Sequence, residues 1–108
     1  MPAVSYGARE SGRTVTVAAG SRFFVELEEN PTTGYQWSDP GFDEKILALA
    51  GDEYTPAGGA AIGGGGTRKF EFAARAPGRT TIRLAYRQPW DRDAAPEKTF
   101  ELSVVVTP

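Results

Sequence analysis

The chain has 108 residues, a formal net charge of −2, a hydrophobic fraction of 40%, and neither Cys nor His. This length is typical of one domain with one packed core, so we expect a single domain over residues 1–108, in which residues 1–12 could be a loosely ordered N-terminal segment. The missing Cys and His exclude disulfides, thiol nucleophiles and the usual acyl-transfer dyads. Mixed charges argue against a nucleic-acid partner, and the short apolar runs argue against a membrane span.

The first residues, Met1 to Gly7, lack the hydrophobic centre of a secretion signal. We therefore expect either a cytoplasmic protein or the mature form of a secreted or periplasmic protein whose signal has been removed. A chain without cysteine suits oxidising and reducing compartments alike, so composition leaves the localisation open.

Apolar residues recur at every second position, which is the pattern of β-strands with one buried face. This pattern predicts strands at 13–18, 22–28, 35–38, 67–74, 80–87 and 98–107, with at least one more within 46–56. The residues expected to face inward are Val15, Val17, Phe23, Val25, Leu27, Tyr35, Trp37, Phe70, Phe72, Ile82, Leu84, Tyr86, Phe100, Leu102, Val104 and Val106. Seven to eight short strands separated by turns predict an all-β fold, an immunoglobulin-like antiparallel β-sandwich.

Three unusual loops should emerge at one end of this sandwich if successive strands alternate in direction. They are the hexapeptide Asn-Pro-Thr-Thr-Gly-Tyr at 30–35, the Gly- and Ala-rich tract at 57–66, and the segment that opens with Gln-Pro-Trp at 88–90. Plain turns at 19–21 and 39–43 fall at the other end. Loops on a rigid scaffold often carry function, so we expect a binding surface at the first end.

The motifs of these loops also occur in a recognisable order. Asn-Pro-Thr-Thr-Gly-Tyr at 30–35 is followed by Gly-Gly-Gly-Gly-Thr at 63–67 and then by Pro-Trp at 89–90, just after Leu-Ala-Tyr at 84–86. Through nearly the whole chain, this order and spacing resemble the chagasin family of cysteine peptidase inhibitors. The resemblance implies an immunoglobulin-like fold, no enzymatic activity, no cofactor and no metal.

The resemblance further implies a reversible, competitive inhibitor that acts as a monomer on papain-like, cathepsin-L-like cysteine peptidases. Loops 30–35, 57–66 and 87–96 would plug the active-site cleft of the protease. The protease-binding residues that the resemblance implies are Asn30, Pro31, Thr32, Thr33, Gly34, Tyr35, Gly63, Gly64, Gly65, Gly66, Arg87, Gln88, Pro89 and Trp90.

Within this set, the resemblance implies distinct roles. Thr32 and Thr33 would approach the catalytic cysteine of the protease, with Thr32 the nearer. The glycines of the second loop would follow the non-primed side of the cleft, and Pro89 and Trp90 the primed side. One position departs from the family pattern, because Gln88 stands where Arg is common. Either a charged contact is lost there or Arg87 supplies it from a different direction.

The composition of the loops suits entry into a narrow cleft. Loops 30–35 and 57–66 carry no charge, and burying unpaired charge would be costly. Glycines allow close backbone approach, while Pro31 restricts the chain and lowers the entropy lost on docking. Trp90 offers a large rigid apolar surface of the kind that dominates binding energies.

Each loop also has an ordinary structural interpretation. The hexapeptide could be a tight turn, the Gly- and Ala-rich tract a flexible connection, and Trp90 could fold back onto the core edge. A different function is also open, namely a module that binds a carbohydrate or a cell-surface partner with Trp90 and Tyr54 as an aromatic platform. Such a platform should tolerate changes at Thr32 and Thr33, whereas the inhibitor needs all three loops.

Two further patterns are weak. The segment Gly63 to Thr67 lacks the Lys and the following helix of a phosphate-binding loop. A calcium site built from Asp39, Asp43 and Glu44 is conceivable, but no motif supports it.

Overall fold

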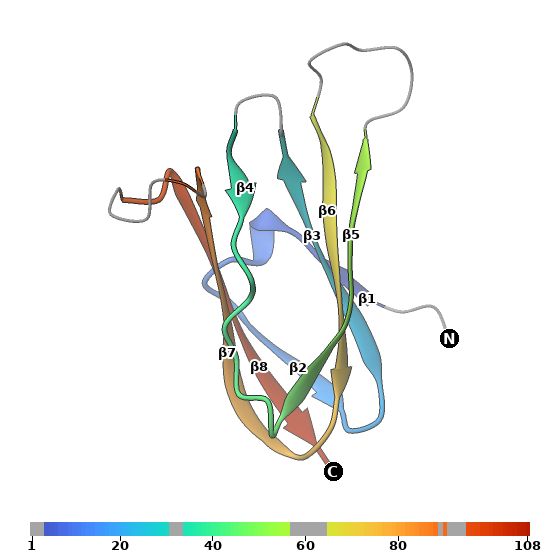
Figure 1. Cartoon of the computed structure of the whole chain (residues 1–108). Helices are drawn as coiled ribbons and strands as arrows, with labels where there is room; N and C mark the ends of the chain where they lie inside the picture. The colour runs from blue at the N-terminus through green and yellow to red at the C-terminus, as the bar shows by residue number, and fades with distance from the viewer. Residues whose placement is uncertain (1–3, 31–33, 57–64, 89, 91–94) are drawn as a thin grey trace.

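The computed structural model describes residues 4–30, 34–56, 65–88, 90 and 95–108. Over these residues the chain forms two β-sheets that face each other (Figure 1), one in the order β1-β3-β6-β5 and the other in the order β2-β8-β7-β4. The elements are β1 (Val4–Tyr6), the 3-10 helix η1 (Ala8–Glu10), β2 (Thr14–Ala18), β3 (Arg22–Glu29), β4 (Gln36–Trp37), β5 (Leu47–Pro56), β6 (Gly66–Ala74), β7 (Gly78–Arg87) and β8 (Lys98–Thr107). The predicted all-β, immunoglobulin-like sandwich is confirmed. None of the helices in the described ranges is long and apolar enough to cross a membrane.

Both sheets are mixed rather than wholly antiparallel. β1 runs parallel to β3, and β2 runs parallel to β8, while the remaining strand pairs are antiparallel. β1 lies before Arg13, where the period-two pattern predicts no strand. Between β1 and β3 the chain passes through β2 in the opposite sheet, so β3 re-enters the first sheet in the direction of β1. The parallel pairing of β1 with β3 therefore follows from two crossings between the sheets.

The period-two pattern places the predicted residues in the core between the sheets. The buried hydrophobic residues are Phe23, Val25, Leu27, Trp37, Leu47, Phe70, Phe72, Ala74, Ile82, Leu84, Tyr86, Phe100, Leu102, Val104 and Val106. Val15, Val17 and Tyr35 are partly buried and pack against this core. β2 lies at the edge of its sheet, which explains why its valines are less covered.

The ambiguous region 46–56 forms one strand, β5, that contains a bulge. Leu49 pairs with Phe72 but Gly51 pairs with Glu71, so one extra residue is inserted between them. A bulge shifts the side-chain alternation by one position. After it, Asp52 and Tyr54 occupy the face that Leu47 and Leu49 occupy before it, which is why this strand shows no continuous period-two pattern.

The strand ends that carry the three unusual loops lie together at one end of the sandwich, here called the loop end (Figure 1). The cross-strand pairs at this end are Glu29↔Gly66, Pro56↔Gly66, Gln36↔Arg87 and Tyr86↔Lys98. The expectation from alternating strand directions therefore holds for the strand ends that flank these loops.

Adjacent phenylalanines on β3 test the assignment of faces. Phe23 is 1% exposed and its ring stacks on Phe72 at 5.4 Å, so Phe23→Ala should lower the free energy of unfolding by about 3–5 kcal/mol. Phe24 lies on the outer face, where the Lys69 ammonium sits 4.2 Å from its ring centre. Phe24→Ala should cost roughly 1 kcal/mol or less. Urea unfolding of both variants measures the difference, and equal losses would show that the faces are wrongly assigned.

Candidate functional site

The loop 30–35 joins two strands that belong to different sheets, β3 and β4. A hairpin loop is closed by the backbone ladder of its own two strands, and that closure is not available here. Side-chain contacts close this loop instead. The backbone N–H of Trp37 donates to Glu29 Oε2 at 2.8 Å, and the indole Nε1–H of Trp37 donates to the carbonyl of Glu28 at 2.9 Å.

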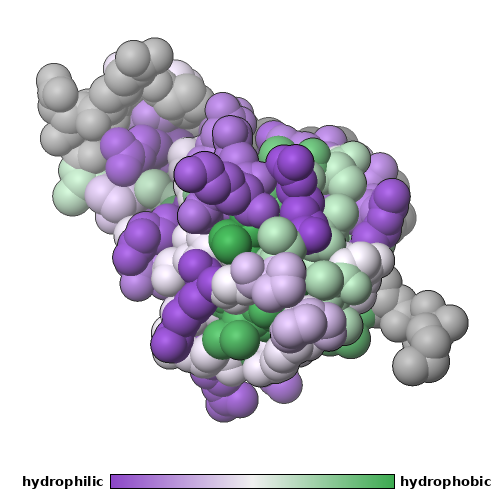
Figure 2. All heavy atoms as spheres, turned by 90° about the horizontal axis from the view of Figure 1, so that it is seen from below, coloured by the Kyte–Doolittle hydropathy of each residue, from purple (hydrophilic) through white to green (hydrophobic). Residues whose placement is uncertain are grey.

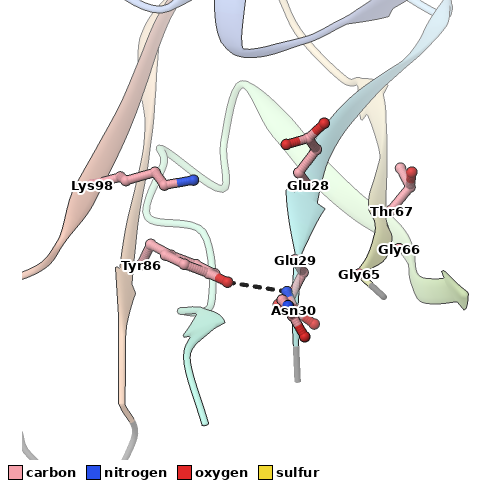
Figure 3. Close-up of a pocket in the computed structure, with 8 residues that line it drawn as sticks. All are labelled: Glu28, Glu29, Asn30, Gly65, Gly66, Thr67, Tyr86 and Lys98. Carbon is pink, nitrogen blue, oxygen red and sulfur yellow. Dashed lines mark hydrogen bonds between the residues drawn. The ribbon is translucent and has the colours of Figure 1, made fainter. Parts of the chain in front are cut away.

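A third bond holds the start of the same loop. The backbone N–H of Asn30 donates to the hydroxyl of Tyr86 at 3.0 Å (Figure 3). Tyr86 belongs to β7 in the opposite sheet and is 6% exposed. Its ring stacks with Tyr35 at 5.6 Å and packs against Trp37 at 5.0 Å, and the Lys98 ammonium lies 5.0 Å from the ring centre. The hydroxyl therefore reaches across the sandwich from a ring that three side chains contact.

Glu29 is a buried acid, with only 3% of its surface exposed. Burying a carboxylate is costly unless it is paired and hydrogen-bonded. Its Oε1 lies 3.3 Å from an Arg68 guanidinium nitrogen. Arg68 also pairs with Asp52. Its Nη2–H donates a hydrogen bond to Asp52 Oδ2 at 3.2 Å, and its Nε lies in ion-pair contact with Asp52 Oδ1 at 2.6 Å. Glu29, Arg68 and Asp52 thus form a charged cluster beneath the loop end.

Gly65 and Gly66 stand where the second loop enters β6, and both are closely packed. A Cβ atom on Gly66 would collide with the Thr55 carbonyl and lie 2.7 Å from the Tyr54 ring. A Cβ atom on Gly65 would lie 3.1 Å from the Glu29 carbonyl. Close packing therefore requires glycine at position 66, while a side chain at position 65 would need a small shift of its neighbours.

The first and third loops touch each other through Gly34 and Trp90. Gly34 has φ of +81°, a conformation that residues with a Cβ rarely adopt. A Cβ atom on Gly34 would also lie 2.6 Å from the Cη2 atom of Trp90. Trp90 remains 71% exposed, so its indole rests on the first loop while most of its surface faces solvent. This arrangement differs from an indole folded back onto the core edge.

The remaining predicted residues divide into two groups. Arg87 ends β7 opposite Gln36, and it is partly buried, as are Gln88 and Tyr35. The others lie outside the described residues, so their roles stay predictions: Pro31, Thr32, Thr33, Gly63, Gly64 and Pro89.

A hollow of about 430 Å³ lies between the bases of the first and second loops (Figure 3). It is lined by Glu28, Glu29, Asn30, Gly65, Gly66, Thr67, Tyr86 and Lys98. Figure 3 shows Tyr86 and Lys98 on one wall, with the residues of β3 and β6 opposite them. The loop bases thus border an open hollow whose walls come from both sheets.

The opposite end of the sandwich has an ordinary mixed surface. Figure 2 shows hydrophilic side chains there, interrupted by small, separate hydrophobic patches. Asp43 lies at this end and accepts the backbone N–H of Lys45 at 2.9 Å, which closes a local turn. Within the part of the chain that the structure describes, His, Cys, Asp and Glu nowhere form a group of three or more that could hold a metal ion.

Sequence reasoning missed the cluster of Glu29, Arg68 and Asp52, although two of its members follow the period-two pattern. Glu29 comes two residues after the inward-facing Leu27, and Arg68 comes two residues before the inward-facing Phe70. Opposite charges at inward positions of neighbouring strands are a signal for a buried ion pair. Asp52 gave no such signal, because the bulge in β5 moves it to the inner face.

Matched glycine substitutions test the contact between Gly34 and Trp90. Gly20 has φ of +89° and open space around its Cα, so Gly20→Ala carries the backbone strain alone. Both Gly20→Ala and Gly34→Ala should lose about 1–2 kcal/mol of stability. Because only Gly34→Ala displaces the indole, it alone should change the fluorescence emission and the acrylamide quenching of Trp90. Identical spectra for the two variants would contradict the contact.

Comparison with known proteins identifies relatives along most of the chain. Residues 16–104 match the family described as "Chagasin family peptidase inhibitor I42". The chain is 32% identical to chagasin of Trypanosoma cruzi over 84 residues, which cover 74% of this chain and 76% of that protein.

Two solved structures share the fold. The crystal structure of the cysteine protease inhibitor EhICP2 from Entamoeba histolytica superimposes with a TM-score of 0.87 and 23% identity, covering 99% of this chain and 100% of that one. PbICP-C, solved in complex with falcipain-2, superimposes with a TM-score of 0.72 and 17% identity, covering 95% and 98% of the two chains.

Proposed function

Since this chain belongs to the chagasin family of peptidase inhibitors, we propose that its loop end inhibits papain-family cysteine peptidases reversibly and competitively. Loops 30–35, 57–66 and 87–96 enter the active-site cleft together, and the chain acts as a monomer. The protein is an inhibitor, not an enzyme. The cleft-facing residues in this proposal are those that the resemblance implies, from Asn30 to Tyr35, from Gly63 to Gly66 and from Arg87 to Trp90.

The observation that carries the proposal is the contact between the first and third loops. Trp90 rests on Gly34, and Asn30 is tied to Tyr86 in the opposite sheet. Loops that already hold their shape lose less conformational entropy when they bind. These contacts support one combined binding surface rather than three separate loops. The position of the flanking strand ends, which all lie at the loop end, supports it as well.

The chemistry of the loops fits a cleft that contains a thiolate and an imidazolium. Thr32 and Thr33 are small and uncharged, so a tip built from them can approach the catalytic cysteine without stranding a charge. The glycines of the second loop offer backbone groups for strand-like pairing along the cleft wall. Trp90, which is 71% exposed, supplies apolar area to the other side of the cleft.

The aromatic-platform alternative has less support. Tyr54 covers Gly66, and its hydroxyl points to the Glu29 carbonyl at 3.5 Å. A ring that is partly buried by its own loop base presents little face to a sugar. Of the two aromatic residues in that interpretation, Trp90 is the exposed one, at 71%.

Titration of papain, or of a cathepsin-L-like enzyme, with the purified chain tests the inhibition. We expect a nanomolar or lower inhibition constant over an interface of about 1,600 Å². Trp90→Ala should raise this constant at least about tenfold, because a buried tryptophan is a common centre of binding energy. Leu49→Ala is the matched control, since Leu49 is 39% exposed but lies on β5 away from its loop. Full protease activity in a large excess of inhibitor would refute the proposal, and an unchanged constant for Trp90→Ala would remove Trp90 from the interface.

Resistance to cleavage follows from the backbone conformation of Gly34. Proteases of this class bind substrates as extended chains, and Gly34, with φ of +81°, interrupts an extended conformation. The inhibitor should therefore remain intact between Asn30 and Tyr35 during prolonged incubation with excess protease. Mass spectrometry of the mixture measures this directly. Rapid and specific cutting within the hexapeptide would show that it binds as a substrate.

A further inference from the structure

The closure of loop 30–35 depends on two side chains that are almost wholly buried. Tyr86 is 6% exposed and Glu29 is 3% exposed. Tyr86 holds the first residue of the loop, Asn30, by accepting its backbone N–H at 3.0 Å. Glu29 holds the far side of the loop by accepting the backbone N–H of Trp37 at 2.8 Å. A bond from a buried side chain therefore holds the chain at each end of the loop.

The Tyr86 hydroxyl has a role that is separate from the packing of its ring. The ring contacts Tyr35 and Trp37 in the core, and a phenylalanine ring would keep these contacts. Of the atoms of Tyr86, the hydroxyl oxygen is the one that bonds to the base of the loop, and it does so from the opposite sheet (Figure 3). Removing only this oxygen therefore separates the positioning of the loop from the stability of the core.

Glu29 connects the first loop to the base of the second. It ends β3, and in the sheet it lies opposite Gly66, the first residue of β6. Its carboxylate pairs with Arg68, which is itself bound to Asp52 on β5. The same side chain thus links β4 to the two strands that carry the second loop. A change in its charge should disturb both loops together.

We propose that Tyr86 and Glu29 are positioning residues for inhibition: their buried side chains hold the first loop in its binding shape across the gap between the sheets. This inference rests on the proposed function. A loop that samples other shapes is competent to bind only part of the time, and the apparent affinity falls by that fraction. Loss of positioning therefore lowers the association rate constant, whereas loss of a direct contact mainly raises the dissociation rate constant.

The experiment compares Tyr86→Phe with Tyr6→Phe, which removes the same hydroxyl from β1, where the ring contacts Phe23. Both rate constants for papain are measured by stopped-flow inhibition. Tyr86→Phe should lower the association rate constant roughly tenfold, the scale of one lost hydrogen bond, and leave the dissociation rate constant unchanged. Tyr6→Phe should change neither. A higher dissociation rate constant for Tyr86→Phe, with unchanged association, would overturn the inference.

Glu29→Gln gives an independent variant that keeps the shape of the side chain. Its matched control is Glu71→Gln, because Glu71 also pairs with an arginine, Arg22, at 2.7 Å, but on the outer face of the same sheet. Glu29→Gln should slow association by a similar factor, and Glu71→Gln should not. Equal rate constants for Glu29→Gln and the unchanged chain would remove Glu29 from the proposal.

Amide hydrogen exchange provides a readout that needs no protease. In Tyr86→Phe the amide of Asn30 should exchange faster, while the amides of Val25 and Phe70 in the core strands keep their protection. Faster exchange at all three positions would indicate a general loss of stability and would overturn a positioning role. Failure of the unchanged chain to inhibit papain would refute the proposed function, whereas unaltered exchange at Asn30 would refute only the positioning.

Discussion

The structure at the loop end depends on one constraint, which is that the first loop crosses from one sheet to the other. Its flanking strands, β3 and β4, cannot share a backbone ladder, because they lie in different layers of the sandwich. Side chains therefore close the loop, and they must reach across the space between the layers. Glu29 and Tyr86 have the length and the polar ends to do so, and both are buried. The two ends of the loop are thus held by groups beneath it.

This constraint has an electrostatic consequence. A carboxylate that is 3% exposed needs a compensating charge, since an unpaired buried ion would destabilise the fold. Arg68 provides it from β6, and Asp52 provides the second partner of Arg68 from β5. The pairing extends the closure of the first loop to the strands that carry the second. Trp90 adds the third loop through its contact with Gly34. Within the described residues, the bases of the three loops are therefore joined by direct contacts.

Much of the fold was predictable because alternation is a local property. Each buried residue of β3, β6, β7 and β8 follows the two-residue period of a strand with one face inside, so the core could be read from spacing. β5 was not readable in this way, since its bulge between Leu49 and Gly51 changes which residues face inward. Arg68 and Glu29 could have been recognised from their inward positions. The bond from Asn30 to Tyr86 could not, because it joins residues 56 positions apart in different sheets.

The amino-acid sequence by itself determined the strands other than β1, most of the core residues, the common direction of the three unusual loops and, through its motifs, the family. These properties depend on residue type and spacing along one chain, which the sequence contains completely. Only the tertiary structure decided how the loops are held: which hydroxyl reaches the loop base, and which glycine lies under the indole. Those contacts depend on the separation and offset of two packed sheets, and that geometry arises from the core as a whole rather than from any local pattern.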